Sequence, residues 1–349
     1  MVRFSVLDPW TDPRGGEIER VRIDNGILAL EVISLGGIIR ALWTPDKHGE
    51  RANIVLGCDS AEDYLTQSAH LGAIAGRFAN RIANGKMHYQ GQDYQLDVNQ
   101  ATNCLHGGRE GFNRKNWHLG QLPDGVRLTL MSPDGDMGFP GNCTVQLDYR
   151  LAGNNLYVEI LASVDKACPV SLTQHSYFNL DGSETNHEHL MQIDAKRYLT
   201  MNDVSVPTGI AETAGSIFDL SQPIRLGDKL HAAELASTRG YDHCYMMNDP
   251  DGSLARFGCL SSPVSGRAMT VYTNQPSVQL YCANFLDGTV GRNQQVLNQQ
   301  VLNQHHGVCL EPQMLPDSPN QGERFGDDVW LVPGKVYHHI SRYQFDADA

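Results

Sequence analysis

The chain has 349 residues and a net charge of -13 at pH 7, because 40 acidic side chains outnumber 27 basic ones. This charge argues against a nucleic-acid or anionic-membrane partner, since such partners are bound by clustered Lys and Arg. A small neutral ligand is the natural partner of such a chain. The length allows a large core but does not decide the number of domains, because large β proteins often form single units.

The start of the chain predicts neither export nor membrane insertion. Residues 1–16 contain no apolar run of signal-peptide length, and the most apolar stretch, 26–43, is interrupted by Glu31 and Arg40. We therefore expect a cytoplasmic protein without a membrane-spanning segment. Eight cysteines are scattered without a Cys-x-x-Cys pair, a pattern that signals neither a zinc site nor a redox motif. We interpret them as reduced thiols, mostly small buried side chains.

Short strands are the predicted elements along most of the chain. Helical periodicity is weak and confined to 60–64 and 226–235. Apolar residues instead alternate with polar ones at a period of two, and Gly, Asn and Asp separate the runs. The clearest runs are 126–130, 145–151, 156–160 and 269–272. This pattern predicts an all-β protein, a large antiparallel β-sandwich, and the absence of a linker-like stretch predicts a single domain over 1–349.

Two of the predicted strands carry ionisable side chains on one face. In 173–180, alternation places His175, Tyr177 and Asn179 together, and in 307–313 it places Glu311 with Gln313. A histidine and a carboxylate presented from strands are the minimum equipment for general acid/base catalysis near neutral pH.

Further polar segments lie between the strands. Two Arg and two Asn in 76–86 suit fork-like donation to ligand hydroxyls, with a structural salt bridge as the alternative. His106 precedes a glycine pair, where a ligand can approach closely or where the histidine simply belongs to a turn. Asp242 and Gln279 add an acceptor and an amide. Sugar sites need this mixture, because each buried hydroxyl left unpaired costs about 1 to 3 kcal/mol.

The usual cofactor and metal motifs are missing from the sequence. It contains no Gly-x-Gly-x-x-Gly after a strand, no phosphate-binding loop and no His-Glu-x-x-His, so we predict neither a cofactor nor a metal. His187-Glu188-His189 and His305-His306 could ligate a metal, but each lacks further ligands at suitable spacing and is interpreted as surface histidines. The tandem segments 295–299 and 300–304 are interpreted as a duplicated loop.

Five motifs in this order along the chain together resemble the aldose 1-epimerase, or galactose mutarotase, family. They are Gly-Arg-x-Ala-Asn-Arg-Ile at 76–82, Asn-x-Leu-His-Gly-Gly at 103–108, Thr-x-His-x-Tyr-Phe-Asn-Leu at 173–180, Tyr-Asp-His at 241–243 and Leu-Glu-Pro-Gln-x-Leu-Pro-Asp-Ser-Pro-Asn at 310–320. The resemblance covers nearly the whole chain. It implies a single β-supersandwich and an isomerase that interconverts the α and β anomers of free hexoses such as glucose and galactose, without a cofactor.

The resemblance also implies roles for particular residues. His175 looks like the general acid that protonates the ring oxygen, Glu311 like the general base on the C1 hydroxyl, and His106 like a second active-site histidine. The expected sugar-binding residues are Asn80, Arg81, Asp242, Gln279 and Tyr177. The chain departs from the family in the duplicated segment before Glu311 and in Met314, where relatives often have an aromatic residue or histidine. Both departures bear on substrate preference more than on chemistry.

The implied reaction needs an acid and a base. As the ring opens, O1 loses a proton and O5 gains one, which fits a histidine that begins protonated and a glutamate that begins ionised. A hexose-6-phosphate mutarotase is an alternative that would need an added basic cluster. A non-catalytic carbohydrate-binding β-sandwich is another, and a glycoside hydrolase would use paired carboxylates. We expect a monomer or weak homodimer, and the choice between glucose and galactose stays open.

Overall fold

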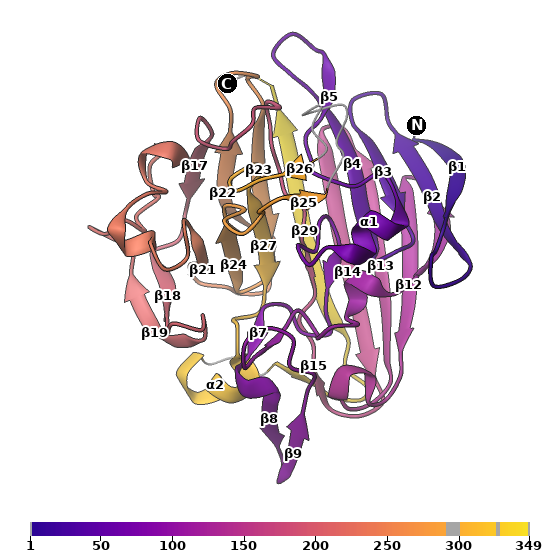
Figure 1. Ribbon diagram of the computed structural model, residues 1–349, viewed down its shortest axis with the longest axis vertical. Coiled ribbons are helices and arrows are strands. Elements are labelled where there is room, and N and C mark those ends of the chain that lie inside the picture. Colours follow the sequence, from indigo (N-terminus) through magenta and orange to yellow (C-terminus); the bar gives the residue numbers. More distant parts are fainter. Residues whose placement is uncertain (1, 291–300, 326–328, 348–349) are drawn as a thin grey trace.

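The computed structural model describes residues 2–290, 301–325 and 329–347, which are built mainly from β-strands (Figure 1). The first large sheet has the order β1 (Arg3–Thr11), β2 (Glu17–Asp24), β3 (Ala29–Ile33), β4 (Ile38–Pro45) and β5 (Arg51–Asn53). The second has the order β11 (His118–Leu122), β12 (Gly125–Ser132), β13 (Cys143–Ala152), β14 (Asn155–Val164), β29 (Tyr337–Asp346), β23 (Ala268–Thr273), β22 (Ala255–Ser261), β17 (Leu190–Ile193) and β20 (Ile224–Arg225). The third has the order β19 (Pro207–Glu212), β18 (Arg197–Met201), β21 (Asp242–Met246), β24 (Ser277–Tyr281) and β27 (Cys309–Gln313).

Short strand pairs and two helices complete the described chain. The pairs are β7 (Arg81–Ile82) with β10 (Cys104–Leu105), β6 (Ile74–Ala75) with β16 (Thr173–Gln174), β8 (Lys86–Tyr89) with β9 (Gln92–Gln95), β15 (Cys168–Pro169) with β28 (Trp330–Leu331), and β25 (Thr289–Val290) with β26 (Val301–Leu302). The helices are α1 (Ala61–Thr66) and α2 (Ser318–Phe325). Paired strands run antiparallel throughout these sheets, which confirms the predicted all-β antiparallel class.

The three large sheets share one apolar core. Alternation along β14 buries every second residue, and β13 does the same over most of its length. The buried faces join one continuous cluster of apolar side chains that contains members of all three large sheets, for example Leu30, Leu147 and Leu280. The cluster runs from Val21 to Phe345 in sequence, and the single domain over 1–349 stays a prediction.

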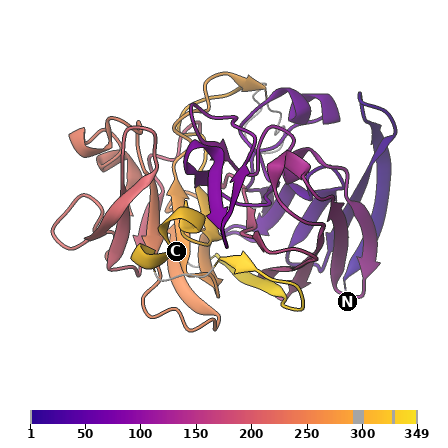
Figure 2. The same ribbon diagram turned by 90° about the horizontal axis from the view of Figure 1, so that it is seen from below.

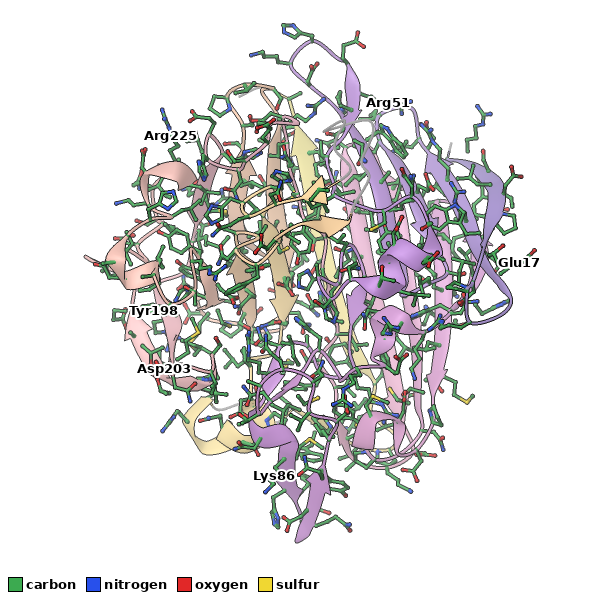
Figure 3. The ribbon with its side chains drawn as sticks, in the orientation of Figure 1. Glu17, Arg51, Lys86, Tyr198, Asp203 and Arg225 are labelled. Atoms are coloured by element: carbon green, nitrogen blue, oxygen red, sulfur yellow. The ribbon has the colours of Figure 1, made fainter. Side chains whose placement is uncertain are left out.

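The two views show how the sheets are distributed (Figures 1 and 2). The indigo strands β1 and β2 lie on one side of the molecule, and the β18–β19 hairpin lies on the opposite side. Charged side chains such as Glu17, Arg51 and Lys86 point outward at the periphery (Figure 3). Neither described helix has the length or apolar character needed to cross a membrane.

The helix predictions succeed once and fail once. α1 begins after Ser60, whose hydroxyl accepts a hydrogen bond from the Asp63 amide, as the expected helix at 60–64 requires. The expected helix at 226–235 is wrong, because two separate 3-10 turns, Leu226–Asp228 and Ala233–Leu235, occupy this stretch. The Gly227 amide donates to the carbonyl of His187 rather than within a helix. α2 was not predicted.

The predicted strand at 173–180 is mostly irregular. Only Thr173–Gln174 pairs in a ladder, with an isolated bridge at Phe178, and the whole segment is buried. Asn179 does not join His175 and Tyr177 on a shared polar face. Its side-chain amide instead donates to the carbonyls of Ser183 and His306, so it holds two loops together. Alternation fails here because bridges to different segments turn the chain between these residues.

The duplicated segment lies partly outside the described residues. Its first copy, 295–299, and Gln300 belong to the stretch that is not described. In the second copy, Val301–Leu302 forms β26 and pairs with β25, so this part is a short hairpin strand rather than a loop.

Candidate active site

One cavity of about 280 Å³ collects all eight of the residues predicted to form the site. They reach it from the β7–β10 pair, from the irregular segment after β16, and from three neighbouring strands of the third sheet, β21, β24 and β27. The described residues that line it are Ser68, Ala69, His70, Asn80, Arg81, Asn99, Gln100, Leu105, His106, His175, Tyr177, Asp242, Gln279, Tyr281, Phe285, Leu286 and Glu311.

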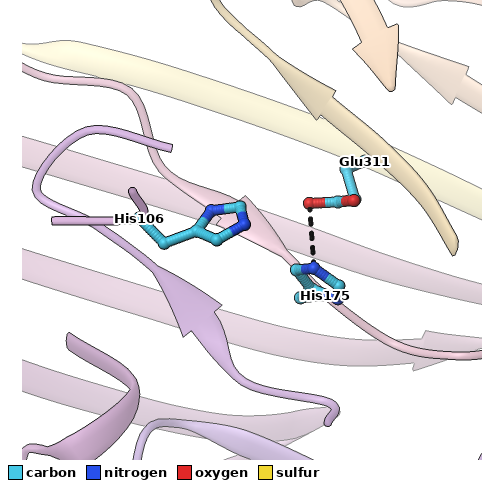
Figure 4. Close-up of side chains that lie close together, drawn as sticks. All are labelled: His106, His175 and Glu311. Atoms are coloured by element: carbon cyan, nitrogen blue, oxygen red, sulfur yellow. Dashed lines mark ion pairs between the residues drawn. The ribbon is translucent and has the colours of Figure 1, made fainter. Parts of the chain in front are cut away.

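His175 and Glu311 face each other across this cavity (Figure 4). Nε2 of His175 lies 3.5 Å from Oε2 of Glu311, and both side chains are almost fully buried. Together with His106 they offer ligand atoms that all lie within 4.8 Å of one another. This spacing fits an acid/base pair acting on adjacent oxygens, and it would also allow a metal ion to be held.

Backbone contacts fix the orientation of His175. Its amide donates to the carbonyl of Ala73, and its own carbonyl accepts from the amide of Gly72. Nδ1 of the ring lies 3.6 Å from the buried Cys309 sulfur, so Nε2 is left to face the cavity. Tyr177 stacks beside the imidazole at 5.2 Å and donates its hydroxyl to the Ala69 carbonyl.

Strand register brings Glu311, Gln279 and Asp242 together. Gln279 on β24 pairs directly with Glu311 on β27, and its amide donates to Oδ1 of Asp242 on β21 at 2.7 Å. Oε1 of Gln279 and Oε2 of Glu311 are buried, and no described residue forms a hydrogen bond with either. Buried oxygens without partners are costly unless a ligand hydroxyl donates to them, so this wall is built to accept such donors.

Asn80 and His106 lock each other in place. The backbone amide of Asn80 donates to Nδ1 of His106 at 3.1 Å, and the backbone amide of His106 donates to the backbone carbonyl of Asn80 at 2.9 Å. With Nδ1 accepting, the imidazole carries its proton on Nε2. Arg81, the next residue, is held by Gln100 at 2.7 Å and by Asn80. This corner therefore supplies oriented donors to a ligand.

Burial shifts the protonation of the central pair. It lowers the pKa of His175 to about 3, with His70 adding to the effect, and it raises the pKa of Glu311 well above its usual range, with Asp242 adding and Arg81 opposing. Their 3.5 Å separation favours an ion pair, but the distance is too long for a strong hydrogen bond, and desolvation of both groups dominates. Both shifts favour the uncharged forms of the two groups, the opposite of the charged starting states expected from the sequence.

Several lining residues were not predicted. His70 lies 4.7 Å from the ring of His106 and 5.9 Å from that of His175, yet a lone histidine in a loop carries no sequence signal. Tyr281 follows Gln279 by two residues on β24, so alternation could have identified it. Phe285 is 52 % exposed at the cavity, near Tyr281.

The arginine-rich segment 76–86 divides between two tasks. Arg81 lines the cavity, but Arg77 does not. The Arg77 guanidinium is buried and donates to the Ser132 hydroxyl and to the carbonyls of residues 132, 133, 140 and 141. Arg77 therefore has a structural role, but it is held by hydrogen bonds to carbonyls and not by the salt bridge that the sequence offered as the alternative.

The interpretation of the remaining histidines as surface residues is wrong for most of them. His189, His305 and His306 are at most 4 % exposed. His189 accepts a hydrogen bond from the Leu180 amide, and His306 accepts one from the Asn303 amide. They are buried because their ring nitrogens satisfy backbone groups of the loops around them. The interpretation of the cysteines as mostly buried free thiols is confirmed, since all eight are free and seven of them are buried.

The fold and this cavity together define a class: a β-sandwich protein that can hold a small polyhydroxylated ligand and exchange protons with it.

Comparison with known proteins gives the family. The model of the aldose 1-epimerase family matches residues 19–344. Human galactose mutarotase is 39 % identical over 336 residues, 95 % of each chain, and Escherichia coli K12 aldose 1-epimerase is 36 % identical over 330 residues, 93 % of this chain and 94 % of its own. The solved structure of galactose 1-epimerase from Lactobacillus acidophilus superposes with a TM-score of 0.83 at 26 % identity, covering 100 % of this chain and 99 % of its own. The chain belongs to the aldose 1-epimerase family.

Proposed function

We propose that this protein interconverts the α and β anomers of free hexoses such as glucose and galactose, with His175 and Glu311 as its acid/base pair. As a member of the aldose 1-epimerase family, it is an isomerase that acts on sugars. The observation that carries the proposed mechanism is the buried pair of Nε2 and Oε2, 3.5 Å apart in a cavity lined by hydroxyl-binding groups. That separation lets the two groups reach O5 and O1 of one hemiacetal.

The reaction uses one proton on each side of the C1–O5 bond. A bound sugar donates hydrogen bonds to Glu311, which favours its ionised form, and the displaced proton passes to His175. Glu311 then takes the proton of the C1 hydroxyl while His175 protonates O5, and the bond between C1 and O5 breaks. After rotation about C1–C2, the reverse transfers close the ring on the other face, so both groups return to their starting states. The His106 Nε2–H, Arg81 and the Asp242–Gln279 pair hold the hydroxyls.

A free hexose suits this cavity better than a hexose phosphate. Among the described lining residues, Arg81 is the only Lys or Arg, and its guanidinium is already engaged by Gln100 and Asn80. A phosphate dianion would require further cationic donors. A carbohydrate-binding protein without activity would have no need of a buried histidine facing a carboxylate.

Polarimetry on freshly dissolved α-glucose and α-galactose tests the proposal directly. We expect the wild-type protein to speed the approach to the anomeric equilibrium, and Glu311→Gln and His175→Asn each to slow it by about 10²- to 10⁴-fold. The matched control is the surface pair His338–Glu159, 2.9 Å apart on β29 and β14, substituted as His338→Asn and Glu159→Gln. Near-normal rates in either cavity variant would remove that residue from its role.

A cytoplasmic location and a monomeric or weakly dimeric state stay predictions. Fractionation of the source cells checks the first, and sedimentation velocity at several protein concentrations checks the second.

A further inference from the structure

Three histidines from separate loops meet at a second place in the molecule. His187, His231 and His305 have ring centroids 5.4, 5.8 and 6.0 Å apart, and none of them lines the cavity. Glu188, the residue after His187, contacts Arg225 at 3.4 Å, and Arg225 is labelled in Figure 3. The sequence offered His187 and His305 only as members of two incomplete motifs, and the fold brings these motifs together with a third histidine.

The geometry of the first two rings suits a shared cation. Nε2 of His187 lies 3.3 Å from Nδ1 of His305. A tetrahedral ion with metal–nitrogen distances of about 2.0 to 2.1 Å holds two ligand nitrogens about 3.3 Å apart. His231 is exposed, so its ring can turn to present a nitrogen as the third ligand.

The tautomer of His305 is also the one that a ligand needs. Its Nε2 lies 3.0 Å from the carbonyl of Arg239, which can only accept a hydrogen bond. The ring therefore carries its proton on Nε2 and directs the Nδ1 lone pair toward His187. A carbonyl that fixes the far ring nitrogen in this way is the usual outer support of a metal-binding histidine.

Two glycines allow the three loops to approach. A Cβ at Gly240 would lie 2.4 Å from the Asn284 side chain and 3.2 Å from Nε2 of His305. A Cβ at Gly227 would lie 2.9 Å from Cβ of His187, and the Gly227 amide donates to the His187 carbonyl. The turn that leads to His231 can therefore pack against His187 only because residue 227 has no side chain.

We propose that His187, His231 and His305 bind a divalent transition cation such as Zn²⁺, with solvent in the remaining position. The ion joins three loops that are distant in sequence. The loop of His305 leads directly into β27, which carries Glu311. The His305 carbonyl accepts a hydrogen bond from the backbone amide of Asn186, the residue before His187. The bound ion would therefore hold the loop that leads into β27, one wall of the cavity, without contacting the sugar.

Cobalt titration of the full-length chain, stripped with a chelator and desalted, tests this site. We expect one equivalent of Co²⁺ to bind near neutral pH with the visible absorption of a low-symmetry nitrogen site, and Zn²⁺ to displace it. His187→Gln and His231→Gln should each weaken binding about tenfold or more, whereas the exposed His48→Gln control should not. Zn²⁺ should also raise the Tm of the wild type and not that of His231→Gln.

A second possible position for the metal ion is the cavity, where His106, His175 and Glu311 could bind it. Retention of the cobalt signal in His175→Asn supports the proposed site. Loss of the signal in His175→Asn with retention in His231→Gln would place the ion in the cavity and overturn the proposal. Unchanged affinity in both His187→Gln and His231→Gln, or no binding by the wild type, would also overturn it. Because His231 is exposed, its substitution is compatible with a folded chain, which circular dichroism verifies.

Discussion

At the level of single residues, His175 and Glu311 are best treated as a pair that shares one proton. Desolvation lowers the pKa of the imidazole to about 3 and raises that of the carboxyl, so both shifts protect the singly protonated state. Two groups this close titrate as a unit with two apparent pKa values. The lower apparent pKa describes the pair gaining a second proton, and the higher one describes the pair losing the proton that it shares.

This coupling predicts an unusual pH dependence. Acid inactivation requires a second proton on His175, whose pKa is lowered, and alkaline inactivation requires loss of the proton from Glu311, whose pKa is raised. The enzyme-catalysed kcat/KM should therefore show no step from about pH 5.5 to 6.5, where an ordinary histidine would lose nearly half of its charge. Initial polarimetric rates, corrected for the buffer reaction, measure it. A step centred near pH 6.5 would mean that a histidine with an ordinary pKa controls the reaction.

The same residues show where sequence reasoning ends. His175 and Glu311 were found because ionisable side chains on apolar segments are unusual. The direction of their pKa shifts could not be predicted, because it depends on desolvation by walls built from other parts of the chain. His70 was missed for a related reason: only the fold brings its loop against the other two imidazoles.

At the level of elements, the segment around β7 shows how one motif serves both stability and binding. Arg77 binds backbone carbonyls of the 132–141 loop, whereas Arg81, four residues later, faces the cavity. Their separate roles come from partners that only the fold brings to each guanidinium, so the spacing alone cannot show them. The strands were easier to predict: β12, β13, β14 and β23 each contain one of the predicted alternating runs.

The two arginines permit a matched test with Lys, which keeps the charge but loses the planar fork. Arg77→Lys leaves several buried carbonyls without donors and should lower the free energy of unfolding by about 2 to 5 kcal/mol, with little change in KM. Arg81→Lys should raise KM for hexoses while changing stability less. Urea unfolding and initial-rate polarimetry on both variants check this. Equal loss of stability in the two variants would contradict the division of roles.

At the level of the whole molecule, the class of fold followed from period-two alternation, but the way the sheets close around the cavity did not. The segment after β27 meets β7 through contacts between residues more than 100 positions apart, such as the hydrogen bond from the Asp317 backbone amide to the Arg81 carbonyl. Nor could the hydrophobic pattern place buried histidines such as His339, whose ring nitrogens meet the Leu172 carbonyl and the Ser341 hydroxyl only in the folded chain. Their burial affects the stability of the whole protein.

Buried neutral histidines predict that the folded state weakens as the solution becomes acidic. Burial lowers the pKa of His175 to about 3 and the pKa values of His243 and His339 to about 4. Between pH 6.5, where an unfolded histidine titrates, and about pH 4, the unfolded chain binds more protons, so stability falls as pH falls through this window. At pH 5 each of these histidines lowers the free energy of unfolding by about 2 kcal/mol. The raised pKa of Glu311 offsets part of this combined loss.

The slope of unfolding free energy against pH measures this effect, from urea titrations at several pH values between about 5 and 7.5. His339→Gln should reduce the slope by close to one proton even if it lowers stability overall, because its ring is 1 % exposed and held at both nitrogens, by the Leu172 carbonyl and the Ser341 hydroxyl. A wild-type slope near zero over this range would show that the buried histidines accept protons in the folded protein, and a slope unaltered by His339→Gln would exclude that residue as a source.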